Sequence, residues 1–279
     1  MKLTVLIDNN TLIDRYFLGE PGVSYLIEDE SKQILFDVGY SNAFIINAQK
    51  LNINLLQSDV IVLSHGHLDH TWGLDPLLKL YTEAKIESLP CKHSKLIAHP
   101  AIFQSRSLDG LNEIGCTIPQ SKLERHFEIK LQKEPLWLTN KLVFLGEIER
   151  SNDFENKTPM GNIHIDGKTK PDYLLDDTAL AYKGKEGLVI ITGCSHSGIC
   201  NIIEYAKKVC KEDKIVDVIG GFHLMKPSEK QMLGTLNYFE KVKAKKIHAC
   251  HCVDLDSKIA LSKVANLKEV GVGLSIKYD

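Results

Sequence analysis

Three histidines and one aspartate stand within six positions of the sequence, in the order HGHLDH. They are His65, His67, Asp69 and His70. Imidazole nitrogens and carboxylate oxygens are the ligands that zinc and related metals take from proteins. The apolar run Val60–Leu63 directly precedes the cluster and predicts a buried strand. The sequence therefore predicts a metal site on the loop that leaves this strand.

The spacing of the cluster suggests two ions rather than one. Gly66 is expected to let the backbone turn sharply, so that His65 and His67 point to one side. Asp69 and His70 can then face a second ion about 3.5–4 Å away, the spacing of two-metal sites. Each ion still needs a further ligand from elsewhere in the chain.

The composition is that of an ordinary globular protein. Of the 279 residues, 43% are hydrophobic and 25% are charged, which allows a large core. One domain over residues 1–279 is expected, because α/β folds of this length are often single domains. The net charge of -2 gives no electrostatic case for nucleic acid or an anionic membrane as partner. A small molecule is the expected partner; the oligomeric state stays open, with a homodimer as the default because such dimers are common.

Neither a signal peptide nor a membrane span is evident. The N-terminal apolar run Leu3–Ile7 is too short for a signal peptide. No stretch approaches the roughly 18 apolar residues that a membrane span needs. The protein is therefore expected in the cytoplasm. The seven cysteines form no C-x-x-C pair, so neither a disulfide framework nor a four-cysteine zinc site is predicted.

Short apolar strands alternate with helices in both halves of the chain. This pattern fits a two-sheet sandwich with helices outside, and it also fits a doubly wound single sheet. Loops and short helices are expected over residues 83–135, which are more polar. The predicted strands are Lys2–Asp8, Val23–Glu28, Gln33–Asp37, Val60–Ser64, Leu142–Leu145, Thr178–Lys183, Leu188–Thr192, Val216–Gly220 and Lys246–Cys250, and the predicted helices are Asn42–Leu51, Asp75–Tyr81, Ile199–Lys211, Ser228–Lys243 and Lys258–Leu267.

Polar residues with chemical capability follow several of these strands. Ligand sites in layered α/β proteins gather on the loops that leave strand ends. The residues in question are Asp8, Asp37, His65, Cys194–His196, His223 and His251.

The histidine cluster resembles the HxHxDH signature of the metallo-β-lactamase superfamily. LFDVG, which ends at Gly39, looks like the superfamily's first motif, and GLVIITGC, which ends at Cys194, resembles the strand that usually ends in TGD. The late histidine of HACHC, His251, resembles the last metal ligand. This resemblance implies a four-layer αββα sandwich with the metal site at one edge of the two sheets. It also implies zinc, as one or two ions, with iron or manganese as alternatives.

A narrower resemblance is to the branch that includes the archaeal dihydropteroate synthase-like enzymes. The motifs VLSHGHLDHTWGL, GEIER, DDTALAY, GCSHSGICNIIEYA, IGGFHL and HACHC occur in order along the chain. Those enzymes join a dihydropterin pyrophosphate to a ribofuranosyl-aminobenzene phosphate. Membership of the branch does not fix the substrate, since a fold does not by itself give a function.

The sequence departs from the superfamily at two ligand positions. The usual GHTxG histidine is missing, and Cys194 stands where TGD has its aspartate. His196, two residues later, can supply the missing imidazole. The resulting hypothesis is that His65, His67 and His196 hold one metal and that Asp69, His70 and His251 hold the second. Cys194 is either a further ligand or a small residue packed at a strand end.

Three residues are assigned catalytic or substrate roles. Asp69 is expected to act in catalysis as well as in metal binding. His223 follows two glycines that allow close approach to a ligand, which favours a role near the substrate. Arg150 suits a phosphate group, although a solvated surface charge fits equally well. Asp37 is expected to hydrogen-bond a ligand histidine and fix its tautomer. Pocket shape is expected to depend on a variable segment at residues 83–175.

Three functions are compatible with these residues. The first is a metal-dependent hydrolase of a small phosphorylated molecule, in which the metal generates hydroxide at neutral pH. The second is a pterin transferase that couples a dihydropterin pyrophosphate to an aminobenzene ribofuranosyl phosphate. The third is a non-catalytic metal-binding or ligand-binding protein, which would have no open coordination position.

Overall fold

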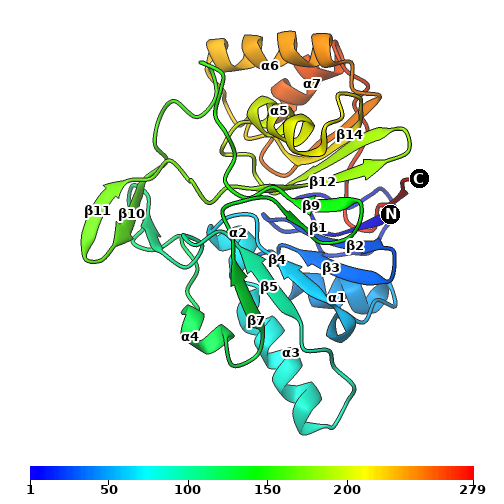
Figure 1. The fold of residues 1–279 in the computed structure, drawn as a ribbon, viewed down its shortest axis with the longest axis vertical. Helices are drawn as coiled ribbons and strands as arrows, with labels where there is room; N and C mark the ends of the chain where they lie inside the picture. Colours follow the sequence, from blue (N-terminus) through cyan, green and yellow to red (C-terminus); the bar gives the residue numbers. More distant parts are fainter.

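The computed structural model describes residues 1–279, and most of its strands form two large sheets that pack face to face (Figure 1). The first sheet has seven strands in the order β16-β1-β2-β3-β4-β5-β7. Strands β16, β1, β2 and β3 pair antiparallel, whereas β3, β4, β5 and β7 pair parallel. Their bounds are β1 Lys2–Ile7, β2 Ser24–Asp29, β3 Lys32–Phe36, β4 Val60–Val62, β5 Lys95–Ala98, β7 Glu128–Leu131 and β16 Ser275–Lys277.

The second sheet has six strands in the order β15-β14-β13-β12-β9-β8. Strands β13, β14 and β15 are parallel, and the others pair antiparallel. Parallel strands carry apolar side chains on both faces because both faces are covered. The bounds are β8 Leu136–Trp137, β9 Leu142–Phe144, β12 Ala179–Gly184, β13 Gly187–Thr192, β14 Ile215–Gly221 and β15 Lys246–Cys250.

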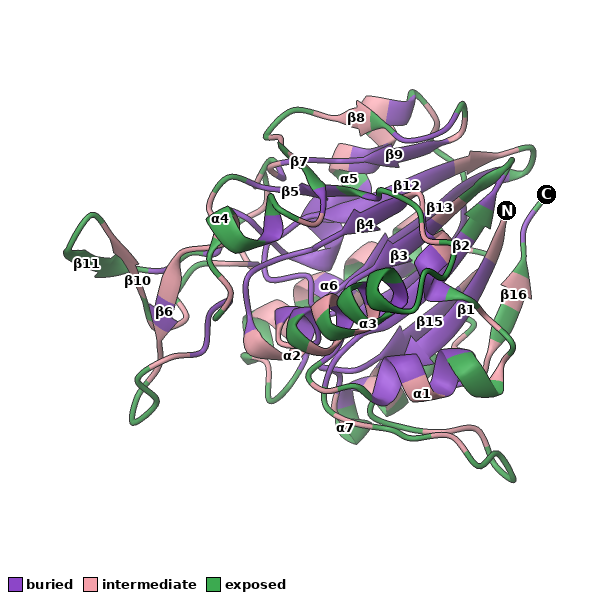
Figure 2. Ribbon diagram, turned by 90° about the horizontal axis from the view of Figure 1, so that it is seen from below, coloured by how far each residue is buried: buried purple, intermediate pink, exposed green.

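Helices cover the outer face of each sheet, which makes four layers (Figure 1). Figure 2, which is seen from below, shows α1 and α3 in front of strands that are mostly buried. Helices α1 and α3 lie on the first sheet, and α5, α6 and α7 lie on the second. A short 3-10 helix, η1, precedes β4. The bounds are α1 Ala43–Lys50, η1 Leu55–Gln57, α2 Leu68–Thr71, α3 Leu74–Ile86, α4 Gln120–Leu123, α5 Ile199–Cys210, α6 Glu229–Val242 and α7 Leu255–Ser262.

Three groups of buried apolar side chains separate these layers. Strand β3 illustrates the arrangement: Leu35 packs towards α1 and α3, while Phe36 packs into the core between the sheets. Successive strand residues point to opposite faces, so an apolar strand can serve two cores. Phe144 of β9 reaches the middle core from the other sheet, and Ile190 of β13 faces α5 and α6. The αββα sandwich expected from the resemblance is therefore confirmed.

The predicted elements differ from the structure mainly in the first half. Residues 83–135 hold the expected loops and one short helix, α4, but they also hold strands β5 and β7, which extend the first sheet and were not predicted. Helix α3 is longer than predicted, and α7 begins at Leu255 instead of Lys258. Asp254 explains the early start of α7, because its side chain caps the helix by accepting a hydrogen bond from the Ser257 N–H.

A small third sheet projects from the sandwich on one side (Figure 1). It consists of β6 Ser105–Ser107, β10 Asn162–Ile165 and β11 Lys168–Pro171 in the order β11-β10-β6. These strands lie within residues 83–175. None of the helices combines the length and the apolar character that crossing a membrane requires.

Candidate metal centre

The HGHLDH loop leaves the end of β4 and enters α2, and Gly66 lies against Arg106. A Cβ atom at Gly66 would lie 2.1 Å from Nη1 of Arg106 and 2.7 Å from the carbonyl oxygen of Ile102. The backbone at Gly66 has no positive φ. The glycine is therefore required by the close approach of Arg106 and not, as the sequence suggested, by a sharp turn.

His65, His67 and His196 form the first group of candidate ligands. Nε2 of His65 lies 3.1 Å from Nδ1 of His67, and the ring of His196 lies 4.7 Å and 4.8 Å from their rings, centre to centre. Two nitrogens bound to one tetrahedral zinc at about 2.0–2.1 Å would be roughly 3.3 Å apart. The spacing of the first two rings thus fits a single ion.

Asp69, His70 and His251 form the second group. Oδ2 of Asp69 lies 3.3 Å from Nε2 of His251 and 3.7 Å from Nε2 of His70. His70 and His251 come from different sheets, since one follows β4 and the other follows β15. The two groups lie side by side, with the rings of His65 and His70 only 4.2 Å apart. The structure therefore brings the members of each predicted ligand set close together.

Buried ring nitrogens without partners indicate what this site can hold. Nε2 of His70, His196 and His251 are all buried and have no hydrogen-bond partner. An unpartnered buried polar atom is costly, and one metal ion in each group would satisfy all three nitrogens. The residues therefore fit a zinc-type ion in each group, although each residue's role as a ligand stays a prediction.

Hydrogen bonds on the opposite ring nitrogens orient the histidines. Nδ1 of His70 donates to Asp37 at 2.6 Å, as predicted for Asp37. Nδ1 of His65 lies 3.0 Å from the Ser64 hydroxyl, which itself donates to Asp37 at 2.7 Å. Nδ1 of His251 lies 3.1 Å from Oδ1 of Asn9. Such partners leave Nε2 of each ring free for a metal.

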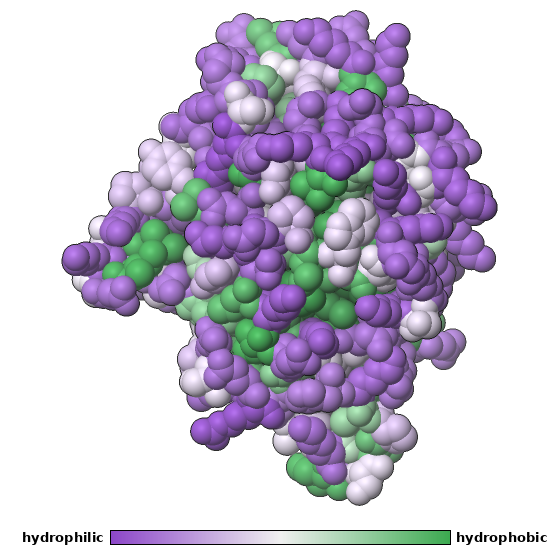
Figure 3. Space-filling model, in the orientation of Figure 1, coloured by the Kyte–Doolittle hydropathy of each residue, from purple (hydrophilic) through white to green (hydrophobic).

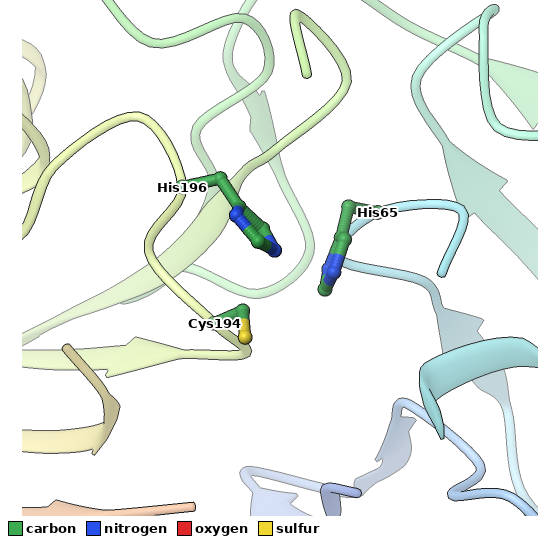
Figure 4. Close-up of side chains that lie close together, drawn as sticks. All are labelled: His65, Cys194 and His196. Atoms are coloured by element: carbon green, nitrogen blue, oxygen red, sulfur yellow. The ribbon is translucent and has the colours of Figure 1, made fainter. Parts of the chain in front are cut away.

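Cys194 lies close to candidate ligands of both groups. Its sulfur is within 4.8 Å of the ligand atoms of His65 and His196, and also within 4.8 Å of those of His70 and His251. Figure 4 shows His65 and His196 facing each other from opposite loops, with the Cys194 sulfur nearby. A thiolate at this position could contact either ion.

A second cysteine, Cys252, was missed by the sequence analysis as a site residue. Its sulfur lies 3.2 Å from that of Cys194 and accepts a hydrogen bond from the His223 N–H at 3.3 Å. Cys194, His223 and Cys252 make a third set of potential ligand atoms within 4.8 Å. Cys252 lies two residues after the end of β15 and next to His251, and this position was the sequence signal that could have identified it as a site residue.

Burial and neighbouring charges set the protonation of the histidines. Burial, helped by the positive charge of Arg106, lowers the pKa of His67 to about 4. For His70, burial acts in the same direction, but Asp69 and Asp37 outweigh it and raise the pKa to about 9. Burial opposes ionisation of Asp69, yet His70 and His251 bring its pKa well below the ordinary value. His67 is thus in the neutral form that binds metal.

Arg106 holds the HGHLDH loop in place, a role that the sequence did not predict. The guanidinium is 1% exposed and pairs with Asp172 at 2.9 Å and with Asp176 at 2.7 Å. Asp176 in turn accepts a hydrogen bond from the Gly66 N–H at 2.8 Å. This buried network ties residues 66, 106 and 172–176 together. No local sequence pattern links positions so far apart.

Arg150 does not reach the site. Its guanidinium donates to Oδ1 of Asn156 and to the carbonyl oxygen of Leu174, both at 2.7 Å. It lines neither the cavity over the histidines nor the one beside it. The structure therefore does not support the expected phosphate contact of Arg150, because its Nη1 and Nη2 groups hold neighbouring loops.

A cavity of about 280 Å³ opens over the two groups. His223 lines it, with a buried Nδ1 that has no hydrogen-bond partner. The cavity wall also includes Leu108, Leu111, Ile114 and Met160, which lie within residues 83–175. The polar residues that face it are Asn9, His67, Asp69, Cys194, His196, His223, His251 and Cys252.

Comparisons with known proteins show what the chain is similar to. The model of the metallo-beta-lactamase superfamily matches residues 18–100. The 7,8-dihydropterin-6-methyl-4-(beta-D-ribofuranosyl)-aminobenzene-5'-phosphate synthase of Methanocaldococcus jannaschii is 32% identical over 265 residues, which cover 90% of this chain and 87% of that protein. A second, uncharacterized protein of the same organism is 32% identical over 97% of this chain and 98% of its own length.

Among solved structures, the fold is similar to that of Tm1679, described as a metal-dependent hydrolase of the beta-lactamase superfamily. The TM-score is 0.83 and the sequence identity 27%, with 100% of both chains covered. The fold, the HGHLDH loop and the identity over most of the chain lead to one conclusion: the chain belongs to the metallo-beta-lactamase superfamily, in the branch that contains the archaeal dihydropterin aminobenzene-phosphate synthase.

Proposed function

We propose that the protein is a metal-dependent hydrolase, with one or two zinc ions, that acts on a small phosphorylated molecule. The observation that carries this proposal is the pair of adjacent ligand groups whose unpartnered Nε2 atoms are buried beneath one cavity. Imidazole and thiol donors suit zinc, with iron and manganese as alternatives. When bound, the metal would supply Lewis-acid chemistry that activates water and offsets charge on a substrate oxygen.

The protein's own residues supply position and proton transfer. Asp69 lies between His70 and His251, so its carboxylate can orient an attacking water as well as hold a metal. His223 lines the cavity, and its unpartnered Nδ1 is suited to protonate a leaving group. Because apolar side chains form part of the cavity lining and keep some water away, charges within the cavity interact more strongly than in bulk water.

A turnover panel tests this proposal. The purified protein, with its metal content measured, would be assayed against phosphomonoesters, phosphodiesters, lactones and thioesters. We expect metal-dependent turnover of at least one class, and we expect His223→Ala to lower it by about 10²–10⁴-fold without loss of metal. Complete inactivity of the fully metal-loaded protein on every class would reject hydrolysis and favour the non-catalytic alternative.

A pterin transferase is the second candidate. Its support is the 32% identity, over 90% of the chain, to a protein named as a dihydropterin aminobenzene-phosphate synthase. In that reaction an aromatic amine would displace pyrophosphate from a dihydropterin, and the cavity would stabilise the leaving-group charge. Incubation of the protein with a dihydropterin pyrophosphate and an aminobenzoate-type amine tests it. Release of pyrophosphate that requires both substrates would replace hydrolase with transferase, and no release would exclude it.

A further inference from the structure

Two cysteine side chains meet beside the candidate metal centre. The sulfurs of Cys194 and Cys252 lie 3.2 Å apart, although 58 positions separate the two residues in the sequence. The Cys252 sulfur also lies 3.3 Å from the carbonyl oxygen of Cys194. The sulfurs of a disulfide are about 2.0 Å apart, so side-chain rotations that bring these two about 1.2 Å closer would allow a bond to form.

The end of β14 explains why the two cysteines can meet. Cys194 follows β13 and Cys252 follows β15, and β14 lies between these strands in the sheet. The last residue of β14 is Gly221, where a Cβ atom would lie 2.6 Å from the Cys252 sulfur and 3.2 Å from Cα of Cys194. The missing side chain at Gly221 therefore leaves the space in which the two loops approach each other across β14.

Backbone hydrogen bonds hold both loops in this position. The Gly221 N–H donates to the carbonyl oxygen of Gly193, the residue before Cys194, at 2.9 Å. The Leu224 N–H donates to the carbonyl oxygen of Cys252 at 2.9 Å. Because the fold already orders both loops, a bond between the sulfurs would cost little further conformational entropy.

A small oxidant can reach both thiols through the cavity over the metal centre. Hydrophilic residues cover most of the face of the molecule in Figure 3. Cys194 and Cys252 are instead buried, with exposed fractions of 6% and 2%. Both nevertheless line the cavity of about 280 Å³. Thiol oxidation depends on access, and this cavity supplies access for a molecule as small as hydrogen peroxide.

Oxidation of this pair would act directly on the candidate metal centre. The Cys194 sulfur lies within 4.8 Å of ligand atoms in both metal groups. A metal binds the thiolate form of cysteine, which a disulfide no longer offers. The Cys252 sulfur accepts a hydrogen bond from the His223 N–H at 3.3 Å, so the same bond would also disturb the backbone of the candidate catalytic histidine.

We propose that Cys194 and Cys252 form an oxidation site, at which a reversible disulfide excludes metal from the candidate metal centre. The oxidant is hydrogen peroxide, which accepts two electrons. One sulfur attacks a peroxide oxygen and the O–O bond breaks, which gives a sulfenic acid and one water. The other sulfur attacks the sulfenic sulfur, the S–O bond breaks, and the hydroxide leaves as a second water with the remaining thiol proton. This inference goes beyond the proposed function and does not depend on which reaction the protein catalyses.

Treatment of the purified full-length protein with hydrogen peroxide tests the inference. Metal-loaded and chelated samples are digested without reduction, and mass spectrometry detects peptides linked through Cys194 and Cys252. We expect this link at least in the chelated protein. The linked protein should bind zinc at least about tenfold more weakly until dithiothreitol restores the thiols. Cys91→Ser is the control, because Cys91 is a half-buried free cysteine outside the cavity, and this variant should behave as the wild type does.

Cys252→Ser separates the disulfide from oxidation of a single thiol. This variant keeps Cys194 but cannot form the link, so peroxide should leave its zinc affinity unchanged. An equal loss of zinc affinity in the wild type and in Cys252→Ser would overturn the inference, because oxidation of Cys194 alone would then suffice. Absence of the linked peptides from both wild-type samples, or full zinc affinity of the linked protein, would also overturn it. These readouts need no substrate, so they stay separate from any failure of the proposed function.

Discussion

The Nδ1 nitrogen of His70 lies 2.6 Å from the Oδ2 oxygen of Asp37, and both side chains are fully buried. The same carboxylate accepts hydrogen bonds from the Ser64 N–H and hydroxyl, each at 2.7 Å. The Ser64 hydroxyl also contacts Nδ1 of His65. One aspartate at the end of β3 therefore orients a candidate ligand of each metal group.

Replacement of Asp37 should weaken both metal groups at once. In Asp37→Asn, one accepting oxygen becomes an N–H donor, so at least one of the three contacts is lost. Changes to such supporting groups typically cost about 10–100-fold in metal affinity. Competition with a zinc chelator measures the affinity, with Asp75→Asn on the exposed face of α3 as the control. Retention of both ions at wild-type affinity would contradict the linking role.

If each ligand group holds its own ion, replacing a ligand of one group should remove only that ion. We expect His196→Ala to remove an ion from the first group and His251→Ala to remove one from the second, because each truncation deletes an imidazole that no neighbour replaces. Elemental analysis of the purified proteins gives the metal per chain. His93→Ala is the matched control, since His93 is exposed and distant from the cluster in sequence. Equal metal content in all four proteins would show that the distal ligands are misassigned.

How far the sequence allowed prediction depended on how local each signal was. HGHLDH and the residues at strand ends are local patterns, and the structure brings them to one edge. Strand β5 is a short segment in a polar region, and it is a strand because β4 pairs with it. Long-range pairing of this kind overrides local propensity. The pair of Arg106 with Asp172 was unpredictable for the same reason: only the fold brings them together.

Arg106 should be necessary both for stability and for the shape of the metal loop. Arg106→Met would leave Asp172 and Asp176 buried without a counter-charge, which typically costs about 3–5 kcal/mol. Arg106→Lys should rescue little, because one ammonium cannot replace a planar group that reaches both carboxylates and two carbonyl oxygens. Urea unfolding measures the loss. A wild-type midpoint for either variant would argue against the network.

Gly66→Ala provides an independent test of the same contact. The added methyl group would occupy the position of the Arg106 guanidinium, so the loop or the arginine must move. We expect lower stability together with lower metal content. In the double variant with Arg106→Met, the steric part of the alanine's effect should fall, since the guanidinium is gone. Additive free energies of unfolding in this double-mutant cycle would exclude a direct contact.

Glu155, which lies at the start of the helix that follows His196, should make the stability of the protein depend on pH. Its carboxylate accepts hydrogen bonds from the Cys200 and Asn201 N–H groups at 3.0 Å, at the start of α5. Burial nevertheless raises the pKa of Glu155 above its ordinary value of 4.5. A raised pKa contributes stability that is present below about pH 4.5 and is lost as the pH rises through the folded-state pKa.

Glu155→Gln mimics the protonated carboxyl group and should remove this dependence. We therefore expect the free energy of unfolding of the glutamine variant to rise relative to wild type as the pH increases from mildly acidic to neutral. Urea unfolding of the chelated proteins measures the difference without interference from metal binding. A difference that is constant over this range, or that falls, would contradict the sign.

Cys194 is expected to be a metal ligand, because its sulfur lies within reach of both groups. The competing explanation is packing, since its neighbour Cys252 lies only 3.2 Å away and both thiols are buried. The contact with Cys252 and burial raise the pKa of Cys194. The Cys194 thiol and the nearby His251 and His223 lower the pKa of Cys252 despite its burial.

Cobalt substitution separates the two explanations, because a thiolate bound to cobalt absorbs in the near ultraviolet. Cys194→Ala should abolish this absorption and weaken the binding of both ions. Cys252→Ala should retain the absorption. Absorption that survives in Cys194→Ala and disappears in Cys252→Ala would assign the ligand to Cys252. Its absence in the wild type would leave both cysteines as packing residues.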